Sequence, residues 1–305
     1  MENQIAPMAY QQLGNSKLMI SKIGFGCMSL KAGQTNIQSI IGSAIDKGIN
    51  YFDTADIYDK GINETNLGQA IKQKRKQLIL ATKVGNVWKP DGSGLDWDPT
   101  KAHIIKAVEE SLVRLQTDYI DLYQLHGGTI EDNIDDTIEA FETLLQQGKI
   151  RYYGISSVRP NVIRAYVERS NIVSVMMQYS LLDRRPEETC LPLLQQHNIG
   201  VLARGSIAGG LLAGKAIKPY LNYTAAEVLA AAKAIKDVET GITDTPSMAI
   251  KFVLANTAIT AAIIGIRTME QITDAVNAIG GPLVTGMQTE LLKQAVASIY
   301  YEQHR

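Results

Sequence analysis

The sequence predicts an α/β protein of the closed (β/α)₈ TIM-barrel class, with a short N-terminal hairpin and extra helices near the C-terminus. Short apolar runs alternate along the chain with longer segments of helical period, which indicates strand-then-helix units and a parallel sheet. Eight such units can be counted, and eight is the number that closes a barrel. No proline- or glycine-rich linker divides the chain, so residues 1–305 are expected to form a single domain.

The elements follow in order. The segment YQQLGNSKLMI (10–20) has turn residues between two alternating stretches, which predicts a hairpin that plugs the bottom of the barrel. Helical patterns include NIQSIIGSAIDKG, HIIKAVEESLVRL and IDDTIEAFETLLQQG. Two connections, 84–99 and 205–223, are too long for plain turns, and long loops in compact domains are often functional. The expected barrel strands are 22–26, 49–53, 78–83, 119–125, 150–155, 174–178, 199–203 and 261–264.

Composition limits the kind of partner. Thirty basic and 31 acidic residues leave a formal charge of −1, so the chain lacks the basic surplus of a nucleic-acid-binding protein. Two cysteines, Cys27 and Cys190, do not make a disulfide framework and favour a reducing compartment. MENQIAPMAY is not a secretion signal, and no apolar run reaches membrane-spanning length. We therefore expect a soluble cytoplasmic protein without nucleic-acid or membrane partners.

Three successive strands end in ionisable residues. INYFD ends in Asp53, LILATK in Lys83 and YIDLYQLH in His126, while Tyr58 follows Asp53 closely enough to fold back over the same rim. Barrel enzymes place their chemistry at the C-terminal ends of the strands, so we expect these four side chains to converge. Each alone has a structural interpretation as a cap, a packing residue or a solvated charge. Four together at one rim favour an active site.

This combination of side chains has a chemical meaning. A phenol with a pKa of about 10 is a weak acid, and the ammonium of Lys83 should lower the pKa of Tyr58. Asp53 can hold Lys83 charged, and His126 can position a carbonyl group or help to relay the proton. The four residues thus predict a general acid that protonates a carbonyl oxygen while a hydride reaches its carbon.

Two other kinds of site are not supported. The four histidines show no paired spacing, so no metal site is predicted. GFGCMS (24–29) nearly fits a dinucleotide-binding fingerprint, but Ser29 replaces the third glycine and the helical pattern begins only near Asn36. Without a helix that starts at the glycines, a pyrophosphate would lack the helix N-terminus that such folds supply.

These segments resemble the aldo-keto reductase family. The resemblance is carried by NYFDTADIYDKGINE, ATKVG, YIDLYQLH and YYGISS, with the early GFGCMSL and the late IIGIRTMEQI, and it spans essentially the whole chain. It implies a (β/α)₈ barrel that binds a nicotinamide cofactor in extended form and reduces aldehydes and ketones. By this resemblance Tyr58 is the general acid, Lys83 and Asp53 tune it, and His126 orients the substrate.

The resemblance also implies a nicotinamide subsite. Ser156, Ser157 and Gln178 stand where the family binds the carboxamide, although asparagine is common at the position of Ser157. Arg204 stands where relatives often stack an aromatic ring; a planar guanidinium can stack, but its charge should disfavour the oxidised ring. The residues expected on this side of the cleft are Gly26, Cys27, Met28, Asp53, Ser156, Ser157, Gln178 and Arg204.

SIAGGLLAGK, from Ser206 to Lys215, together with Gly205 before it, is a candidate pyrophosphate loop. Its glycines and backbone amides suit a phosphate, while the alternative interpretation is a mobile glycine-rich loop. The residues expected to bind the cofactor here are Gly205, Ser206, Gly210, Leu211, Gly214 and Lys215.

GIRTMEQITDA (265–275) opens the last barrel helix. Thr268 and Gln271 have the spacing of a capping box, which does not explain Arg267, because a cation at a helix N-terminus is mildly unfavourable. A bound phosphate would reverse that sign. In the family this is the site of the adenosine 2′-phosphate, so the resemblance favours NADPH over NADH. Gly265 and Asp274 are also expected at the cofactor, while Ala275 departs from the asparagine that relatives often have.

Alternatives remain open for the substrate side and for the activity. Gly127 and Gly128 replace bulkier residues after His126, and Trp88 and Trp97 could wall the pocket or simply pack within their loop. A redox-sensing or channel-associated regulatory subunit would keep the fold and cofactor but turn over slowly. A Schiff-base lyase would use Lys83 as a nucleophile, which a neighbouring Asp53 disfavours by keeping the amine protonated.

Overall fold

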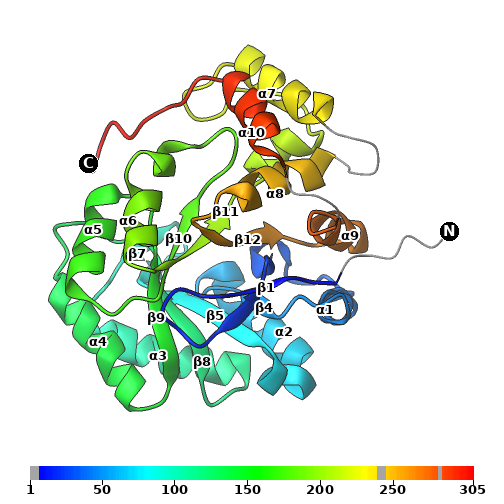
Figure 1. The fold of residues 1–305 in the computed structure, drawn as a ribbon. Coiled ribbons are helices and arrows are strands. Elements are labelled where there is room, and N and C mark those ends of the chain that lie inside the picture. Colours follow the sequence, from blue (N-terminus) through cyan, green and yellow to red (C-terminus); the bar gives the residue numbers. More distant parts are fainter. Residues whose placement is uncertain (1–6, 239–244, 281–283) are drawn as a thin grey trace.

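Eight parallel strands close into a barrel in the computed structural model, which describes residues 7–238, 245–280 and 284–305 (Figure 1). Neighbours follow the chain order from β3 to β12, and β12 pairs with β3 to complete the circle. The predicted barrel and its eight strands are confirmed. The strands are β3 (Ile23–Gly26), β4 (Tyr51–Asp53), β5 (Ile79–Val84), β8 (Ile120–Leu125), β9 (Ile150–Ser156), β10 (Ser174–Gln178), β11 (Gly200–Arg204) and β12 (Ile259–Gly265).

Helices surround the strands (Figure 1). The barrel helices are α1 (Ile37–Asp46), α2 (Ile62–Ile71), α3 (Lys101–Leu115), α4 (Ile134–Gln146), α5 (Pro160–Arg169), α6 (Cys190–Gln196), α8 (Thr245–Ala255) and α9 (Met269–Asn277). The predicted extra helices are α7 (Ala225–Asp237) and α10 (Gly286–Gln294), drawn in yellow and red side by side in Figure 1. Short 3₁₀ helices are η1 (Cys27–Ser29), η2 (Tyr58–Gly61), η3 (Lys72–Gln77), η4 (Arg185–Glu187) and η5 (Ala208–Ala213). None of the helices in these described parts could cross a bilayer.

Two antiparallel hairpins lie outside the barrel sheet. The predicted plug is confirmed: β1 (Tyr10–Gln12) pairs with β2 (Met19–Ser21), and Leu13, Leu18 and Ile20 pack with side chains from inside the barrel. The start of MENQIAPMAY, on which the expectation about secretion depends, lies outside the described residues. The second hairpin, β6 (Asn86–Trp88) with β7 (Leu95–Trp97), occupies the first of the long connections and was not predicted.

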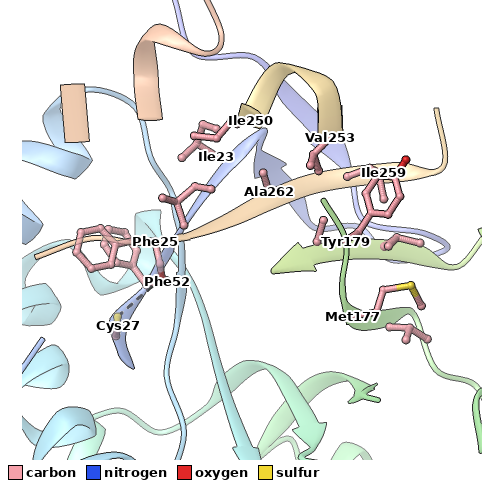
Figure 2. Close-up of a cluster of buried hydrophobic side chains, with 14 of the residues drawn as sticks. Ile23, Phe25, Cys27, Phe52, Met177, Tyr179, Ile250, Val253, Ile259 and Ala262 are labelled. Carbon is pink, nitrogen blue, oxygen red and sulfur yellow. Dashed lines mark hydrogen bonds between the residues drawn. The ribbon is translucent and has the colours of Figure 1, made fainter. Parts of the chain in front are cut away.

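The core has two layers because successive strand residues point to opposite faces. Phe52 points outward and stacks on Phe25, with ring centroids 5.5 Å apart, whereas Tyr51 points into the barrel. Figure 2 shows Ile250 and Val253 of α8 packed with outward side chains of β3 and β12. The same alternation that buries these apolar residues places Asp53 on the inner face, at the end of its strand.

Candidate active site

Polar side chains line the inner face of the barrel at the C-terminal ends of β4, β5 and β8. On β5, Lys83 follows inward-facing Ala81 by two positions, and on β8 Gln124 follows Leu122 in the same way. Lys83 and Gln124 are register partners across the two strands. Strand register therefore brings together residues that are far apart in the sequence.

A buried ion pair forms the base of the cluster. Lys83 Nζ lies 2.5 Å from Asp53 Oδ1 and donates to the backbone oxygen of Thr54 at 2.7 Å. Gln124 Nε2 donates to Asp53 Oδ2 at 3.1 Å and holds the carboxylate in place. Gln124 was not predicted. Its signal in the sequence is a polar residue two positions before His126 within a buried strand.

The charge of Lys83 is maintained by its partners. Burial alone would lower the pKa of this amine, but the attraction of Asp53 and Tyr58 outweighs that effect and raises the pKa above its ordinary value. Lys83 therefore remains an ammonium at neutral pH. A Schiff-base nucleophile needs the free amine, so this environment disfavours a lyase that depends on Lys83.

Tyr58 lies on the turn η2, above the ion pair. Lys83 Nζ is 5.2 Å from the centroid of the Tyr58 ring. Lys83 lowers the pKa of Tyr58, as expected, but burial raises this pKa by more and Asp53 raises it further, so the net shift is upward. The phenol is consequently protonated at neutral pH and can act as a proton donor.

His126 faces Tyr58 across the mouth of the barrel. The two rings are 5.9 Å apart between centroids and nearly perpendicular, at 84°. Burial, together with the charges of Lys83 and Arg204, lowers the pKa of His126 to about 3. The imidazole is therefore neutral, and its Nδ1 has no hydrogen-bond partner among the described residues. A neutral imidazole can hydrogen-bond to a carbonyl group without adding charge.

A cavity of about 980 Å³ opens over this cluster. This volume lies at the upper end of the range of about 300–1,000 Å³ for small-molecule sites. Of the residues predicted for catalysis or cofactor binding, the cavity is lined by Gly26, Met28, Asp53, Tyr58, Lys83, His126, Ser156, Ser157, Arg204, Gly205, Ser206, Gly210, Lys215, Gly265, Arg267, Gln271 and Asp274. Those that do not line it are Cys27, Gln178, Leu211 and Gly214.

Gln178 lies behind the cavity wall and is already engaged. Its Nε2 donates to Asp183 Oδ2 and to the Tyr220 hydroxyl, both at 3.0 Å. Its Oε1 accepts from Arg204 Nη1 at 3.0 Å. Gln178 therefore orients the guanidinium of Arg204, which does line the cavity.

The loop after β11 has the chemistry of a phosphate site. Gly205, Gly209 and Gly210 have φ of 75°, 66° and 100°, values that favour glycine, and the chain curls into η5 at one wall of the cavity. Ser206 Oγ is buried and has no hydrogen-bond partner among the described residues. Lys215 donates to the Gly209 oxygen at 2.9 Å and also lines the cavity. A ligand that carries phosphate groups fits this set of donors.

The start of α9 differs from the predicted capping box. Thr268 caps the helix as expected, because its hydroxyl accepts from the Gln271 backbone N–H at 3.3 Å. Gln271 Oε1, however, accepts from the backbone N–H of Arg267 at 2.9 Å rather than from that of Thr268. Gln271 therefore holds the backbone just before the helix. The guanidinium of Arg267 is at the exposed rim of the cavity.

The side of the cavity that was expected to face a substrate is lined by backbone and by a few side chains that were not predicted from the sequence. Gly127 and Gly128 line the cavity, as do Leu95, Val158 and Arg159. Neither tryptophan of the 84–99 connection lines it. The Trp97 ring instead lies beneath the loop after His126, and Trp88 contacts the turn that carries Tyr58.

Comparisons with known proteins agree with this geometry. The model of the aldo/keto reductase family matches residues 22–295. The chain is 49% identical to an uncharacterized oxidoreductase, YqkF, of Bacillus subtilis, over 98% of this chain and 100% of that protein. It is 33% identical to the aldo-keto reductase yakc [NADP(+)] of Schizosaccharomyces pombe, over 67% of this chain and 62% of that protein. The solved holo form of aldo-keto reductase AKR11C1 from Bacillus halodurans superposes with a TM-score of 0.92, with 47% identity, covering 98% of this chain and 99% of that one.

Proposed function

The chain belongs to the aldo/keto reductase family, and from that premise we propose that it reduces aldehydes or ketones to alcohols with NADPH as the hydride donor. The observation that carries this proposal is the cluster at the floor of the cavity. A protonated phenol, an ammonium held by a buried carboxylate and a neutral imidazole meet there. This set of groups suits the protonation of a carbonyl oxygen.

Each residue of the cluster has a separate task in the proposed reaction. When bound, the nicotinamide cofactor supplies a hydride to the carbonyl carbon. Tyr58 donates its proton to the carbonyl oxygen, and the Lys83 ammonium stabilises the phenolate that remains. Asp53 keeps Lys83 charged and in place. His126 offers a neutral hydrogen bond that orients the carbonyl group.

The cofactor would lie along the cavity from the cluster to α9. We propose that Ser156 and Ser157 hold the carboxamide, that Arg204 faces the nicotinamide, and that the 205–215 loop holds the pyrophosphate. Gln178 would act through Arg204, because its own amide is already engaged. Arg267 would bind the 2′-phosphate, and a relative with NADP(+) in its name supports the choice of NADPH.

The remaining expectations stay proposals as well. We propose that residues 1–305 work as a single barrel domain and that the reaction takes place in the cytoplasm. The thiols of Cys27 and Cys190 are both buried and unpaired, as a reducing compartment would leave them.

Steady-state oxidation of NADPH and of NADH, with a panel of aldehydes and ketones, tests the proposal. We expect turnover with NADPH, and the Tyr58→Phe variant should lose about 10²–10⁴-fold in rate while it still binds NADPH. Cofactor binding is measured separately by fluorescence titration. Tight binding of NADPH without turnover of any carbonyl would favour the regulatory subunit instead. Near-normal turnover by Tyr58→Phe would remove Tyr58 from its proposed role.

A further inference from the structure

The hairpin formed by β6 and β7 contacts both sides of the active site although it lies outside the barrel sheet. We name residues 86–97 the clamp hairpin. Asn86 and Trp88 are two positions apart on β6, so their side chains leave the same face of the strand. Asn86 donates a hydrogen bond to the backbone oxygen of His126, and Trp88 donates one to the backbone oxygen of the residue before Tyr58.

Asn86 holds the segment that carries His126. Its Nδ2 donates to the backbone oxygen of His126 at 2.7 Å. The two residues that follow are Gly127 and Gly128, with φ of 132° and 108°, and they have no side chains that could fix the loop by packing. The imidazole Nδ1 also lacks a partner among the described residues. The orientation of His126 therefore depends strongly on its backbone.

Trp88 holds the turn that carries Tyr58. Its indole Nε1 donates to the backbone oxygen of Ile57, directly before Tyr58, at 3.0 Å. Asp59 and Lys60, directly after Tyr58, have left-handed φ of 47° and 54°, which non-glycine residues adopt only when their surroundings hold them. Lys60 Nζ also lies 5.2 Å from the centroid of the Trp88 ring.

The second strand of the clamp hairpin, β7, packs against the barrel through Trp97. A Cβ atom added to Gly127 would lie 3.4 Å from the Trp97 ring, and one added to Gly85 would lie 2.7 Å from it, so the indole packs directly on both backbones. Trp97 Nε1 donates to the Asp132 carboxylate at 3.1 Å. The hairpin is thus fixed at one end while β6 reaches both catalytic segments.

We propose that the clamp hairpin sets the relative position of Tyr58 and His126, with Asn86 and Trp88 as positioning residues. This inference rests on the proposed reduction, in which both rings must meet the same carbonyl oxygen. Their near-perpendicular contact, 5.9 Å between centroids, is the geometry that the two hydrogen bonds would maintain. Small displacements of such groups reduce the rate of the chemical step more than they reduce ligand binding.

Two single variants test the proposal by kinetics. Asn86→Leu keeps the size of the side chain and removes the donor, and Trp88→Phe keeps a ring and removes the indole N–H. We expect kcat to fall by roughly 10- to 100-fold in each, with the Kd for NADPH and the denaturation midpoint close to wild type. Val87→Ala, on the opposite face of β6, is the matched control and should keep kcat. Loss of stability in step with loss of kcat, or no loss relative to the control, would overturn the proposal.

A second measurement does not depend on turnover. In protein with isotope-labelled aromatic rings, wild type should give an NMR cross-peak between the rings of Tyr58 and His126. We expect that cross-peak to weaken in Asn86→Leu and Trp88→Phe and to persist in Val87→Ala. If wild type reduces no carbonyl, the proposed function fails while the cross-peaks still decide the positioning role. Unchanged cross-peaks in both variants would refute that role even in an active enzyme.

Discussion

Lys83 is the residue on which the electrostatics of the site depend. Its ammonium is 1% exposed, lies 2.5 Å from Asp53 and opposes the rise in the pKa of Tyr58 that burial causes. The polar strand ends in the sequence predicted that Asp53 would hold Lys83 charged, and the two residues form an ion pair. The sign of the shift at Tyr58 could not be read from the sequence, because it depends on how completely the fold removes water from the phenol.

Lys83→Met should therefore change both rate and stability. Removing the cation leaves Asp53 buried without its partner, at a cost of about 3–5 kcal/mol in unfolding free energy. It also removes the charge that opposes the rise in the pKa of Tyr58, so alcohol oxidation, which needs the phenolate as a base, should require higher pH. The pH profile of oxidation and a denaturant titration measure the two effects. Lys83→Arg is the control that keeps a cation, and an unshifted profile in Lys83→Met would contradict the tuning role.

Asp56 is a partly buried acid near the turn of Tyr58. Its Oδ1 has no hydrogen-bond partner among the described residues, and the nearby carboxylate of Glu64 is already bonded by Thr82 and Arg114, both at 2.6 Å. Burial, with a smaller contribution from Glu64, raises the pKa of Asp56 to about 8. The folded state therefore binds a proton that the unfolded state releases near pH 4, and stability falls as the pH rises towards 8.

Asp56→Asn should stabilise the protein in alkaline solution. The amide keeps the shape of the side chain and cannot ionise, so the variant should gain about 1–3 kcal/mol over wild type at about pH 8. The gain should shrink as the pH falls below about 4, where the carboxyl group is protonated in both states. Denaturant titrations of both proteins at several pH values measure the difference. A gain in stability that is the same at every pH would show that ionisation of Asp56 is not its cause.

At the scale of elements, the plug hairpin closes the bottom of the barrel through very close backbone contact. Gly14 has a φ of 51°, and a Cβ atom added there would lie 2.4 Å from the backbone oxygen of Val173. The sequence correctly predicted a hairpin from the turn residues of segment 10–20. It could not show which backbone atoms the turn would meet, because that contact joins segments more than 150 residues apart.

Gly14→Ala should cost more than about 1 kcal/mol in unfolding free energy. Alanine would have to adopt a left-handed φ there, and its methyl group would clash with a backbone atom. Gly33→Ala is the matched control: its φ is 81°, but nothing lies within 4 Å of the added Cβ. The difference between the two denaturation midpoints isolates the effect of the backbone atoms that crowd Gly14. Equal midpoints would mean that the hairpin moves away from the barrel without loss of stability.

At the scale of the whole molecule, the cavity brings together segments that are far apart in the sequence. Its lining includes residues that follow β3, β4, β5, β8, β9, β11 and β12, so a bound dinucleotide would connect segments from most of the chain. A ligand that binds the folded state alone stabilises it by about 2.7 kcal/mol at a concentration 100 times its Kd. Cofactor binding should therefore appear as a rise in the melting temperature of the entire barrel.

NADPH should raise the melting temperature more than NADH does at equal concentration. Arg267 is the expected cause, since a charge-assisted hydrogen bond to the 2′-phosphate is worth about 1.5–3 kcal/mol. Arg267→Ala should weaken NADPH binding by roughly 10- to 100-fold and leave NADH nearly unchanged. Added salt should reduce the preference of wild type, because the guanidinium is exposed. Equal losses for both cofactors would show that Arg267 supports the fold instead.

The sequence by itself determined the barrel, the plug hairpin and the family, because these depend on local periodicity and on short motifs. It also predicted that Asp53, Tyr58, Lys83 and His126 would converge, since each stands at or just after the end of a recognisable strand, and all four line one cavity. Residues that act through partners far along the chain left weaker signals. In the sequence, Gln124 is a polar residue within a predicted strand. Asn86 and Trp88 belong to a long connection for which no regular structure was predicted.

Tertiary structure decided what those residues do. Strand register placed Gln124 beside Asp53. Burial outweighed the expected effect of Lys83 on the pKa of Tyr58, and burial with two nearby cations lowered the pKa of His126. Packing of the 84–99 connection turned two tryptophans away from the cavity and against the backbone of the catalytic segments. Desolvation and contacts between distant segments depend on the assembled molecule, and periodicity along a chain carries no information about either.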